Sequence, residues 1–233
     1  MLDYDRPLVS VIIAVKNGER FLAAAIESVL AQDYAPYEII VVDGHSVDAT
    51  TAIAKSYPCV RLIAQVEEGV ADAYNVGVDA ARGELIAFLS HDDLWTPNKL
   101  SAQVDYMLCH PKIQYAITQV RFFLEPGLTL PAGFRKELLV EDHVGLMMET
   151  LIVRKACFSL VGGFDPRYSS SEDADWFARA SDQQVPWGVV PQVLLRKRVH
   201  DANLTFTDPK SFRNMFRILK RSIERKRSLS SDV

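Results

Sequence analysis

Short apolar runs alternate with stretches of helical spacing through the first 110 residues, and this alternation is the strongest constraint on the fold. Leu22, Ile26 and Val29 recur at helical spacing in one of the intervening stretches. The runs themselves are mostly apolar, as is typical of strands covered on both faces, and lie at residues 9–15, 38–42, 60–66 and 84–89. The alternation predicts an α/β fold with a mostly parallel central sheet, helices on both faces and a Rossmann-like N-terminal half.

The second half of the sequence is less regular. Strands are predicted at residues 114–123, 149–154 and 187–195, helices at 155–161 and 171–182, and a loop at 125–144. Because neither an internal repeat nor a linker is evident, we expect one domain over residues 1–208, with halves 1–110 and 111–208. A basic amphipathic helix is expected to follow at residues 209–233.

Charge is unevenly distributed along the chain. Residues 210–227 contain eight Lys or Arg and one Glu, so this stretch carries +7 and the remainder carries −11 of the net −4. An acidic body lacks the basic face of a nucleic-acid-binding protein. It suits a site in which carboxylates surround a divalent cation.

Cysteine spacing and hydropathy limit the compartment. Cys59, Cys109 and Cys157 are too far apart for a disulfide framework or a zinc-binding spacing. The longest uncharged stretch, residues 183–195, is shorter than the ~20 residues of a membrane helix. The first residues lack the basic and apolar regions of a secretory signal. We therefore expect a cytoplasmic protein.

Carboxylates follow two of the predicted strands. Asp43 ends the second run, in VVDGHSVDAT, and Asp92 and Asp93 follow the fourth, in FLSHDD. Ligands of open α/β sheets bind at the carboxyl ends of strands, and adjacent acids repel each other unless a positive charge lies beside them. The sequence has neither a glycine-rich dinucleotide fingerprint nor a P-loop. We therefore expect phosphates to be held through a cation bound by these acids.

Each acid also has a structural alternative. Asp43 precedes a glycine, which is typical of a turn, and Asp48 is equally compatible with capping a helix and with the site. Thr96, followed by proline, is predicted to be the N-cap of a helix. Because that assignment leaves Asp92 and Asp93 without a capping role, a metal site is the favoured interpretation of the pair.

The order of several motifs resembles one enzyme family. The blocks are VSVIIAVKNGERFLAAAIESVLAQDYAPYEIIVVDGHSVDAT, GVADAYNVGVDAARGELIAFLSHDDLWTPNKL, VRKACFSLVGGFDPRY and SEDADWFARA. In this order, over residues 8–200, they resemble the family 2 glycosyltransferases. The resemblance implies a GT-A type fold and an inverting transfer of a sugar from a nucleotide-diphosphate donor to an acceptor hydroxyl, with Mn²⁺ or Mg²⁺ as cofactor. Residues 1–110 would form the nucleotide-sugar-binding half and residues 111–208 the acceptor-side half.

The resemblance also implies how the donor is bound. Asp43 would accept a hydrogen bond from the nucleotide base, expected to be uracil, and Asp72 would lie near the ribose or the diphosphate. The rest of the nucleotide pocket would be formed by the end of the first strand and by the acidic motif, through Ala14, Val15, Asn17 and His91. A UDP-sugar of the hexosyl or N-acetylhexosaminyl type is the expected donor.

Metal-binding and catalytic residues follow from the same resemblance. Asp92 would bind the metal that bridges the diphosphate, with Asp93 beside it. His200, in RKRVHDANLT, would complete the metal site, although a structural role is equally compatible with a lone histidine. Asp173 would be the base that deprotonates the acceptor, with Glu172 as its neighbour.

Two interpretations of Asp173 are open at the level of sequence. Ser170 and Asp173 are three residues apart, which is close to a capping box and would make the acid structural. Asp173 also shares a helix face with Trp176 and Phe177, which should turn inward. Burial would raise the pKa of Asp173 toward the value that a general base needs.

The sequence departs from the family pattern at two positions. Ser90 stands where the acidic motif usually begins with Asp, and Ala14 replaces a usual proline. The Q-x-x-R-W element of processive synthases is absent. We therefore expect a single addition to a saccharide or lipid-linked acceptor in cell-surface polysaccharide or glycolipid assembly. Glu149 and Thr150 are compatible with facing either the acceptor or solvent.

Two alternative functions also remain open. A catalytically silent nucleotide-sugar-binding subunit is compatible with the missing first acid of the motif. A nucleotidyltransferase would share the general architecture, but it would need a glycine-rich basic segment after the first strand.

The C-terminal stretch combines positive charge with an apolar stripe, formed by Phe212, Met215, Phe216, Leu219 and Ile223. Basic amphipathic helices bind anionic membranes, so residues 209–227 are expected to contact the inner face of a membrane or to pack their stripe on the domain itself.

Overall fold

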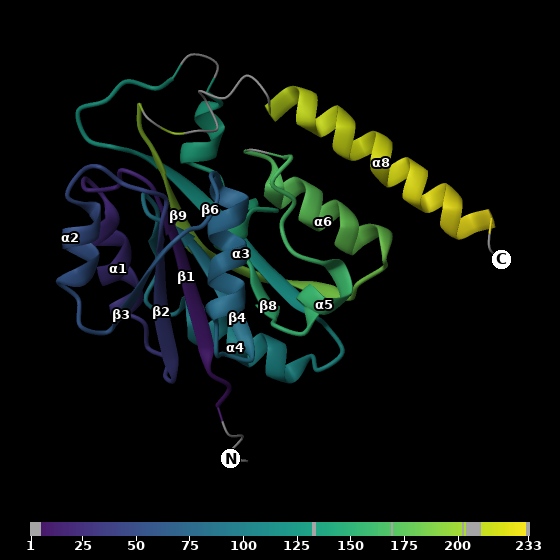
Figure 1. The fold of residues 1–233 in the computed structure, drawn as a ribbon, viewed down its shortest axis with the longest axis horizontal. Coiled ribbons are helices and arrows are strands. Elements are labelled where there is room, and N and C mark those ends of the chain that lie inside the picture. The colour runs from purple at the N-terminus through teal and green to yellow at the C-terminus, as the bar shows by residue number, and fades with distance from the viewer. Residues whose placement is uncertain (1–5, 132–133, 169, 202, 204–210, 232–233) are drawn as a thin grey trace.

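A sheet of nine strands organises the part of the chain that the computed structural model describes (Figure 1). The described residues are 6–131, 134–168, 170–201, 203 and 211–231, without the side chains of 211, 212 and 228–231. The strands are β1 (Val9–Val15), β2 (Tyr37–Asp43), β3 (Val60–Ala64), β4 (Leu85–Ser90), β5 (Leu94–Trp95), β6 (Tyr115–Leu124), β7 (His143–Val144), β8 (Ile152–Arg154) and β9 (Trp187–Val199). Their order is β3-β2-β1-β4-β8-β6-β9-β5, with β7 paired to β6.

The strand directions confirm the predicted sheet. β1 to β4 are parallel neighbours, and β6 runs parallel to β9. The short strands β5, β7 and β8 join in antiparallel orientation. The antiparallel β8 connects the N-terminal parallel strands to the β6–β9 pair, so the two halves share one sheet.

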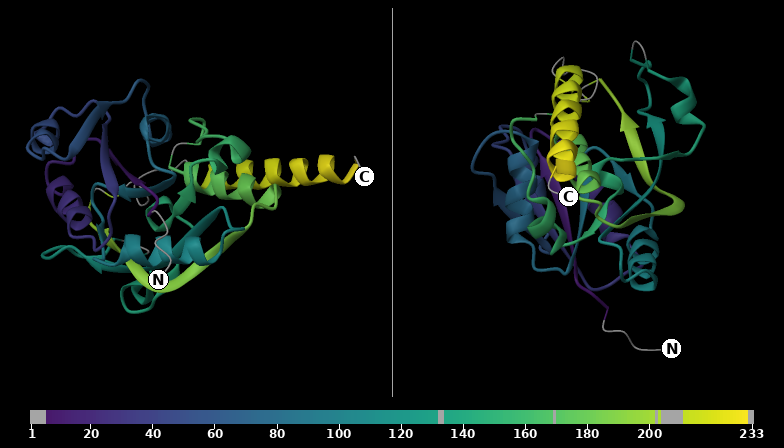
Figure 2. Two further views of the ribbon diagram at one scale, coloured as in Figure 1. Left: turned by 90° about the horizontal axis from the view of Figure 1, so that it is seen from below. Right: turned by 90° about the vertical axis from the view of Figure 1, so that its right-hand side faces the viewer.

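Helices cover both faces of the sheet, as predicted (Figures 1 and 2). One layer contains α1 (Leu22–Leu30), α2 (Thr50–Lys55) and α4 (Lys99–Cys109), and the other contains α3 (Val70–Ala80), α5 (Cys157–Val161) and α6 (Glu172–Asp182). Every residue of β1 is buried, because Val11 and Ile13 face the first layer while Ile12 and Ala14 face the second. Burial on both faces explains why the sequence of this strand does not alternate.

The helix predicted to start at Thr96 begins later. α4 starts at Lys99, and Asn98, which precedes it, makes no capping hydrogen bond with its side chain. The Leu100 N–H in the first turn donates to Gln32 Oε1 instead, so the predicted N-cap role of Thr96 is wrong. The preceding residues form β5, which pairs with β9. Pairing with a strand about a hundred residues away keeps the chain extended, and local capping preference does not encode such a contact.

The segment before β8 is more ordered than its sequence indicates. The predicted loop at 125–144 contains the short helix η1 (Lys136–Leu139) as well as β7. The strand predicted at 149–154 is divided, because η2 (Met148–Thr150) precedes β8. The Thr150 hydroxyl donates to the carbonyls of Gly145 and Met147 and closes this turn. Glu149 is consequently buried, with only 8% of it exposed, and does not face solvent.

The C-terminal helix α8 (Ser211–Ser231) lies beside α6 and extends beyond the body of the protein (Figures 1 and 2). Asn214 and Ile218 are buried. Asp182 of α6 accepts hydrogen bonds from Ser222 and Arg225 at 2.6 and 2.7 Å. These contacts define the face of α8 that docks on the domain.

The predicted apolar stripe lies on a different face of α8. Met215, Leu219 and Ile223 are 52%, 58% and 44% exposed, and Phe216 is exposed as well. The side chain of Phe212 lies outside the described residues. The alternative in which the stripe packs on its own domain is therefore wrong. Among the described residues, none of the helices has the length and apolar character needed to cross a membrane.

Candidate active site

The carboxyl ends of three neighbouring parallel strands form one edge of the candidate site. In the register of the sheet, Val15 of β1 pairs with Asp43 of β2, and Ala14 pairs with Ser90 of β4. β1 therefore lies between the two acidic positions that the sequence singles out. The sheet brings Ala14, Val15 and Asp43 to the same edge as the acidic motif, as expected for strands that run in parallel.

Asp43 has one engaged oxygen and one without a partner. Its Oδ2 accepts the Ser46 N–H at 3.2 Å, which is the local contact of an Asp-Gly turn. Its Oδ1 is buried and accepts no hydrogen bond from the described residues. A buried acceptor without a donor is unfavourable unless a ligand supplies one. This oxygen therefore suits an N–H group of a bound ligand.

Two other predicted nucleotide-binding residues hold the loops around this edge. Asn17 has a φ of 52°, in the left-handed region that Asn tolerates, and its Oδ1 accepts the Val47 N–H at 2.9 Å. Asp72 Oδ2 accepts the N–H groups of Val66 and Glu67 at 3.1 and 2.9 Å. Both side chains therefore shape the walls of the site through backbone contacts.

His91 lies against the loop that follows β1. A Cβ at Gly18 would lie 2.7 Å from the His91 ring, so glycine is required for this close approach. Burial lowers the pKa of His91, and the imidazole is therefore neutral at pH 7. Asp48, in the loop after β2, accepts the N–H groups of Thr50 and of Glu19 in the loop after β1. These contacts support its structural interpretation at the start of α2.

The two adjacent acids of the motif contact different partners. Asp92 Oδ2 lies 2.9 Å from His200 Nε2 and 3.2 Å from Asn203 Nδ2. Asp93 is almost completely buried. It accepts hydrogen bonds from Lys197 Nζ and from the backbone N–H of Arg198, both at 2.8 Å. The structure therefore brings Asp92 and His200 together and directs Asp93 away from them.

The Asp92–His200 pair, rather than a cluster of acids, fits a divalent cation. The described residues contain no group of three or more His, Cys, Asp or Glu side chains placed to hold a metal ion. The Asp92 carboxylate and the His200 imidazole are 2.9 Å apart, and both types of side chain bind divalent metal ions. Mg²⁺ commonly takes one or two carboxylates and completes its shell with substrate phosphates. The pair therefore fits a cation that is bound together with a diphosphate.

Asp92 is ionised in this environment. Burial by itself would raise the pKa of Asp92, but the hydrogen bond to His200 and the nearby positive groups hold that pKa well below its usual range. An ionised carboxylate is the form that binds a metal ion.

Beside Asp93 lies a buried polar cluster that the sequence does not predict. The Ser90 hydroxyl donates to Glu149 Oε1, and Lys197 Nζ lies 3.3 Å from the same oxygen. Burial would lower the pKa of Lys197, but Asp93 and Glu149 outweigh it and hold that pKa above its usual value. One signal was available, because residues 196–198 are three consecutive cations directly after the strand predicted at 187–195, and buried acids need such partners.

Asp173 and Glu172 open α6 at the border of this cluster. Burial, followed by the negative charge of Glu149, raises the pKa of Asp173 to about 6. Burial and the adjacent Asp173 raise the pKa of Glu172 to about 8, and Glu172 Oε2 is buried with no partner among the described residues. A carboxylate with a pKa near neutrality can take up a proton during a reaction.

The structure also bears on the capping alternative for Asp173. Ser171, not Ser170, precedes α6, and its side chain makes no capping hydrogen bond, so the predicted capping box is wrong. Asp173 Oδ1 instead accepts the N–H of the next residue at 2.6 Å. The inward face is confirmed, because Trp176 and Phe177 are buried.

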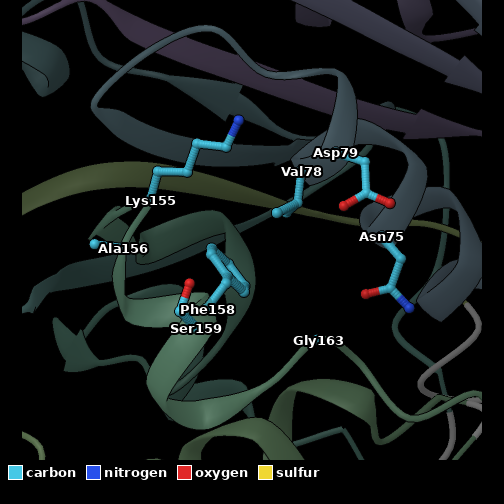
Figure 3. A pocket seen from close by; sticks show the side chains of 8 residues that line it. All are labelled: Asn75, Val78, Asp79, Lys155, Ala156, Phe158, Ser159 and Gly163. Atoms are coloured by element: carbon cyan, nitrogen blue, oxygen red, sulfur yellow. The ribbon is translucent and has the colours of Figure 1, made fainter.

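A groove lies between α3 and α5 (Figure 3). Two of its polar side chains, Lys155 and Asn75, bond to nearby backbone groups. The Lys155 amine donates to the Ala81 carbonyl, and the Asn75 amide bonds both backbone groups of Phe164. Its lining residues are Asn75, Val78, Asp79, Lys155, Ala156, Phe158, Ser159 and Gly163, and they include none of the predicted site residues. The candidate chemistry therefore lies at the strand edge.

We predict that Glu172→Gln removes a pH-dependent destabilisation. The pKa of Glu172 is about 8 in the folded protein against 4.5 when unperturbed. The stability contributed by the neutral acid is therefore fully present below the unperturbed value and is lost as the pH rises through about 8. Glutamine resembles the neutral acid, so the variant should melt near the wild-type temperature at low pH and increasingly above it as the pH rises. Melting curves across this range test the prediction, and a constant difference would contradict it.

Comparison with known proteins gives concordant matches. The chain matches the model of Glycosyl transferase family 2 over residues 10–152. An uncharacterized glycosyltransferase of Rickettsia typhi is 33% identical over 218 residues, which cover 86% of this chain and 67% of that protein. The UDP-Glc:alpha-D-GlcNAc-diphosphoundecaprenol beta-1,3-glucosyltransferase WfgD of Escherichia coli is 39% identical over 107 residues, which cover 45% of this chain and 42% of that protein.

Two solved structures share the fold. TarS 1–349 of S. aureus, in complex with UDP, has a TM-score of 0.68 at 21% identity, covering 92% of this chain and 65% of that one. A mannosyltransferase of Pyrobaculum calidifontis, in complex with GDP-Man and Mn²⁺, has a TM-score of 0.66 at 21% identity, covering 86% and 59%. The chain thus spans about two thirds of the length of TarS 1–349 and of the Rickettsia protein. It has the GT-A fold of these structures, and the family match over most of its length shows that it belongs to glycosyltransferase family 2.

Proposed function

We propose that the chain is an inverting glycosyltransferase that moves a hexosyl or N-acetylhexosaminyl group from a UDP-sugar to an acceptor hydroxyl. The observation that carries the proposal is the division of acids at one sheet edge. Asp92 is held ionised beside His200, whereas burial brings the pKa of Asp173 to about 6. A reaction that expels a diphosphate and deprotonates a hydroxyl needs an ionised carboxylate that binds a cation and a second carboxylate with a pKa near neutrality that accepts a proton. Family membership, the UDP-Glc in the name of WfgD and the UDP bound to TarS support the choice of donor.

The nucleotide is proposed to lie over the ends of β1 and β2. The unpartnered Asp43 Oδ1 would accept the N–H of a uracil ring, which satisfies the buried oxygen. A nucleotide whose base lacks an N–H at this position should bind more weakly, because Asp43 Oδ1 would then stay unpaired. The walls of this pocket would be Ala14, Val15, Asn17, Asp72 and His91.

Asp92 and His200 are proposed to hold Mn²⁺ or Mg²⁺ together with the diphosphate. When bound, the cation supplies a Lewis acid that stabilises negative charge on the leaving group. The Mn²⁺ beside GDP-Man in the Pyrobaculum structure supports a divalent ion. Asp93 would contribute by holding β9 in place through Lys197, which keeps His200 near Asp92.

Asp173 is proposed to take the proton from the acceptor hydroxyl. Attack from the face opposite the leaving group inverts the anomeric centre. Burial keeps the pKa of Asp173 at about 6, so the group is largely ionised at pH 7 and is still basic enough to accept a proton. Glu172, with its pKa near 8, would remain protonated beside it.

A lipid-linked or saccharide acceptor at the inner face of a membrane, in polysaccharide or glycolipid assembly, is the proposed second substrate. The exposed stripe of α8 supports membrane contact, since Met215, Leu219 and Ile223 follow one another at i, i+4 and i+8. Arg213 and Lys220 are exposed on the adjoining face. Pairing of two copies through this stripe would bring like charges together, whereas an anionic bilayer complements them.

A catalytically silent donor-binding subunit is the second candidate function. Ser90, in place of a motif acid, and the lack of a three-ligand cluster among the described residues favour it. Release of UDP from UDP-Glc or UDP-GlcNAc by the purified protein separates the two functions, because an active transferase passes some sugar to water and a binding subunit passes none.

We predict that Asp92→Ala abolishes transfer and removes the Mn²⁺-dependent part of the stabilisation by UDP. Loss of the ionised ligand removes one of two protein contacts to the cation. Thermal melting with UDP, with Mn²⁺ or EDTA present, measures the effect. Asp79→Ala, at an exposed carboxylate of α3, is the control and should behave as wild type. Equal stabilisation of the wild type by UDP in Mn²⁺ and in EDTA would contradict the proposed metal site.

We predict that Asp173→Asn lowers turnover by on the order of 10²–10⁴-fold while UDP and Mn²⁺ binding persist, because an amide cannot accept the acceptor proton. The measurement is sugar transfer, or UDP release to water, by the folded variant. Asp175→Asn changes a neighbouring acid that pairs with Arg179 instead, and it should retain turnover. Near-normal turnover of Asp173→Asn would exclude this residue as the base.

We predict that the protein binds vesicles containing phosphatidylglycerol at low salt and releases them at high salt. Replacing Met215, Leu219 and Ile223 together with Ser should abolish cosedimentation without changing donor hydrolysis. Leu160→Ser removes an equally exposed apolar side chain from α5 and should have no effect. Absence of wild-type binding to anionic vesicles would contradict the membrane contact, and a salt-independent dimer in sedimentation velocity would indicate a second copy as the partner.

A further inference from the structure

Glu149 occupies a buried position beside the acidic motif. Its side chain belongs to η2 and is anchored through one oxygen, because both the Ser90 hydroxyl and Lys197 Nζ contact Oε1. Lys197 also donates to Asp93 at 2.8 Å. The carboxylate is thus fixed to the end of β4 and to β9 at the same time.

The second oxygen of Glu149 remains without such a contact. Among the described residues, no hydrogen bond reaches Oε2, and this oxygen is not one of the fully buried atoms that lack a partner, so it is accessible to a ligand. A carboxylate offers acceptor positions on both of its oxygens. A ligand that carries hydroxyl groups would complete the set.

The location of Glu149 indicates which part of a ligand it would meet. On one side, its partner Ser90 lies two residues before Asp92, where the leaving diphosphate is proposed to bind. On the other side, its negative charge acts on Asp173, the proposed base. In an inverting displacement the transferred sugar lies between the leaving group and the base. Glu149 is bonded to Ser90 on the leaving-group side, and it is near enough to the base for its charge to act on Asp173.

We propose that Glu149 is a specificity-determining residue whose Oε2 accepts a hydrogen bond from a hydroxyl group of the transferred sugar. This inference rests on the proposed transferase function and extends it to the choice of sugar. Lys197 and Ser90 act as positioning residues, since they hold Oε1 and thereby orient Oε2.

Ser90 has a defined part in this arrangement. Its hydroxyl donates to Glu149, whereas a carboxylate at position 90 would place two negative charges within hydrogen-bond distance and repel it. The pair can therefore carry one carboxylate, on either residue. In this chain the negative charge is on Glu149. The serine at position 90, where the family motif has an acid, accompanies that carboxylate and donates a hydrogen bond to it.

The test compares binding of UDP with binding of UDP-Glc and UDP-GlcNAc. UDP lacks the transferred sugar, so Glu149→Gln should leave its Kd within about twofold and should weaken the preferred UDP-sugar by about ten- to a hundredfold, the range for loss of a hydrogen bond to a charged group. Ser90→Asp alone should lower the melting temperature. Ser90→Asp combined with Glu149→Gln restores one carboxylate to the pair and should recover at least part of the UDP-sugar affinity.

Glu38→Gln is a matched control at the opposite edge of the sheet. Glu38 also accepts a serine hydroxyl, that of Ser10, at 2.6 Å and faces a cation, Arg61. This control should bind all three nucleotides as the wild type does. Equal weakening of UDP and UDP-sugars by Glu149→Gln, or no weakening of either, would overturn the inference. A wild type that binds neither UDP nor any UDP-sugar would instead overturn the proposed function.

Discussion

The buried ion pair between Asp93 and Lys197 joins the end of β4 to β9. Both side chains are largely buried, at 1% and 19% exposure, and breaking such a pair by removing one partner typically costs ~3–5 kcal/mol. The other Asp93 oxygen binds the backbone N–H of Arg198, two residues before His200. Asp93, which the sequence suggested as a second metal ligand, instead bonds to β9, and its two contacts hold β9 where His200 meets Asp92.

The same burial gives neighbouring acids different tasks. Asp92 has an imidazole and nearby cations and stays ionised, whereas Asp173 and Glu172 have mainly each other and Glu149 and are pushed toward the neutral form. Environments that separate the pKa values of nearby carboxylates are a recurring way to obtain binding and proton transfer from one residue type. A single lysine, Lys197, neutralises part of the charge of two carboxylates, Asp93 and Glu149. A cation bound with the donor would add positive charge on the Asp92 side.

Much of the N-terminal half follows from sequence because its strands are buried on both faces. β1 was predicted with correct bounds, and the rule that parallel strand ends share an edge placed Asp43 beside the acidic motif. Asp173 was predicted to turn inward from the spacing of its apolar neighbours. The direction of Asp93 and the burial of Glu149 could not be predicted, because both depend on tertiary contacts of η2 and of the segment after β4 with β9 and its neighbours. Those segments are distant along the chain, and no local periodicity reports on their contacts.

The contact between Ser90 and Glu149 also constrains how this branch of the family can change over time. A lineage that gains an acid at position 90 while keeping Glu149 passes through a repulsive intermediate, and one that loses Glu149 first passes through an intermediate without the charge. Each single step is disfavoured, so the two positions should change together or not at all. Relatives should accordingly divide into two groups, distinguished by whether the end of β4 or η2 bears the carboxylate.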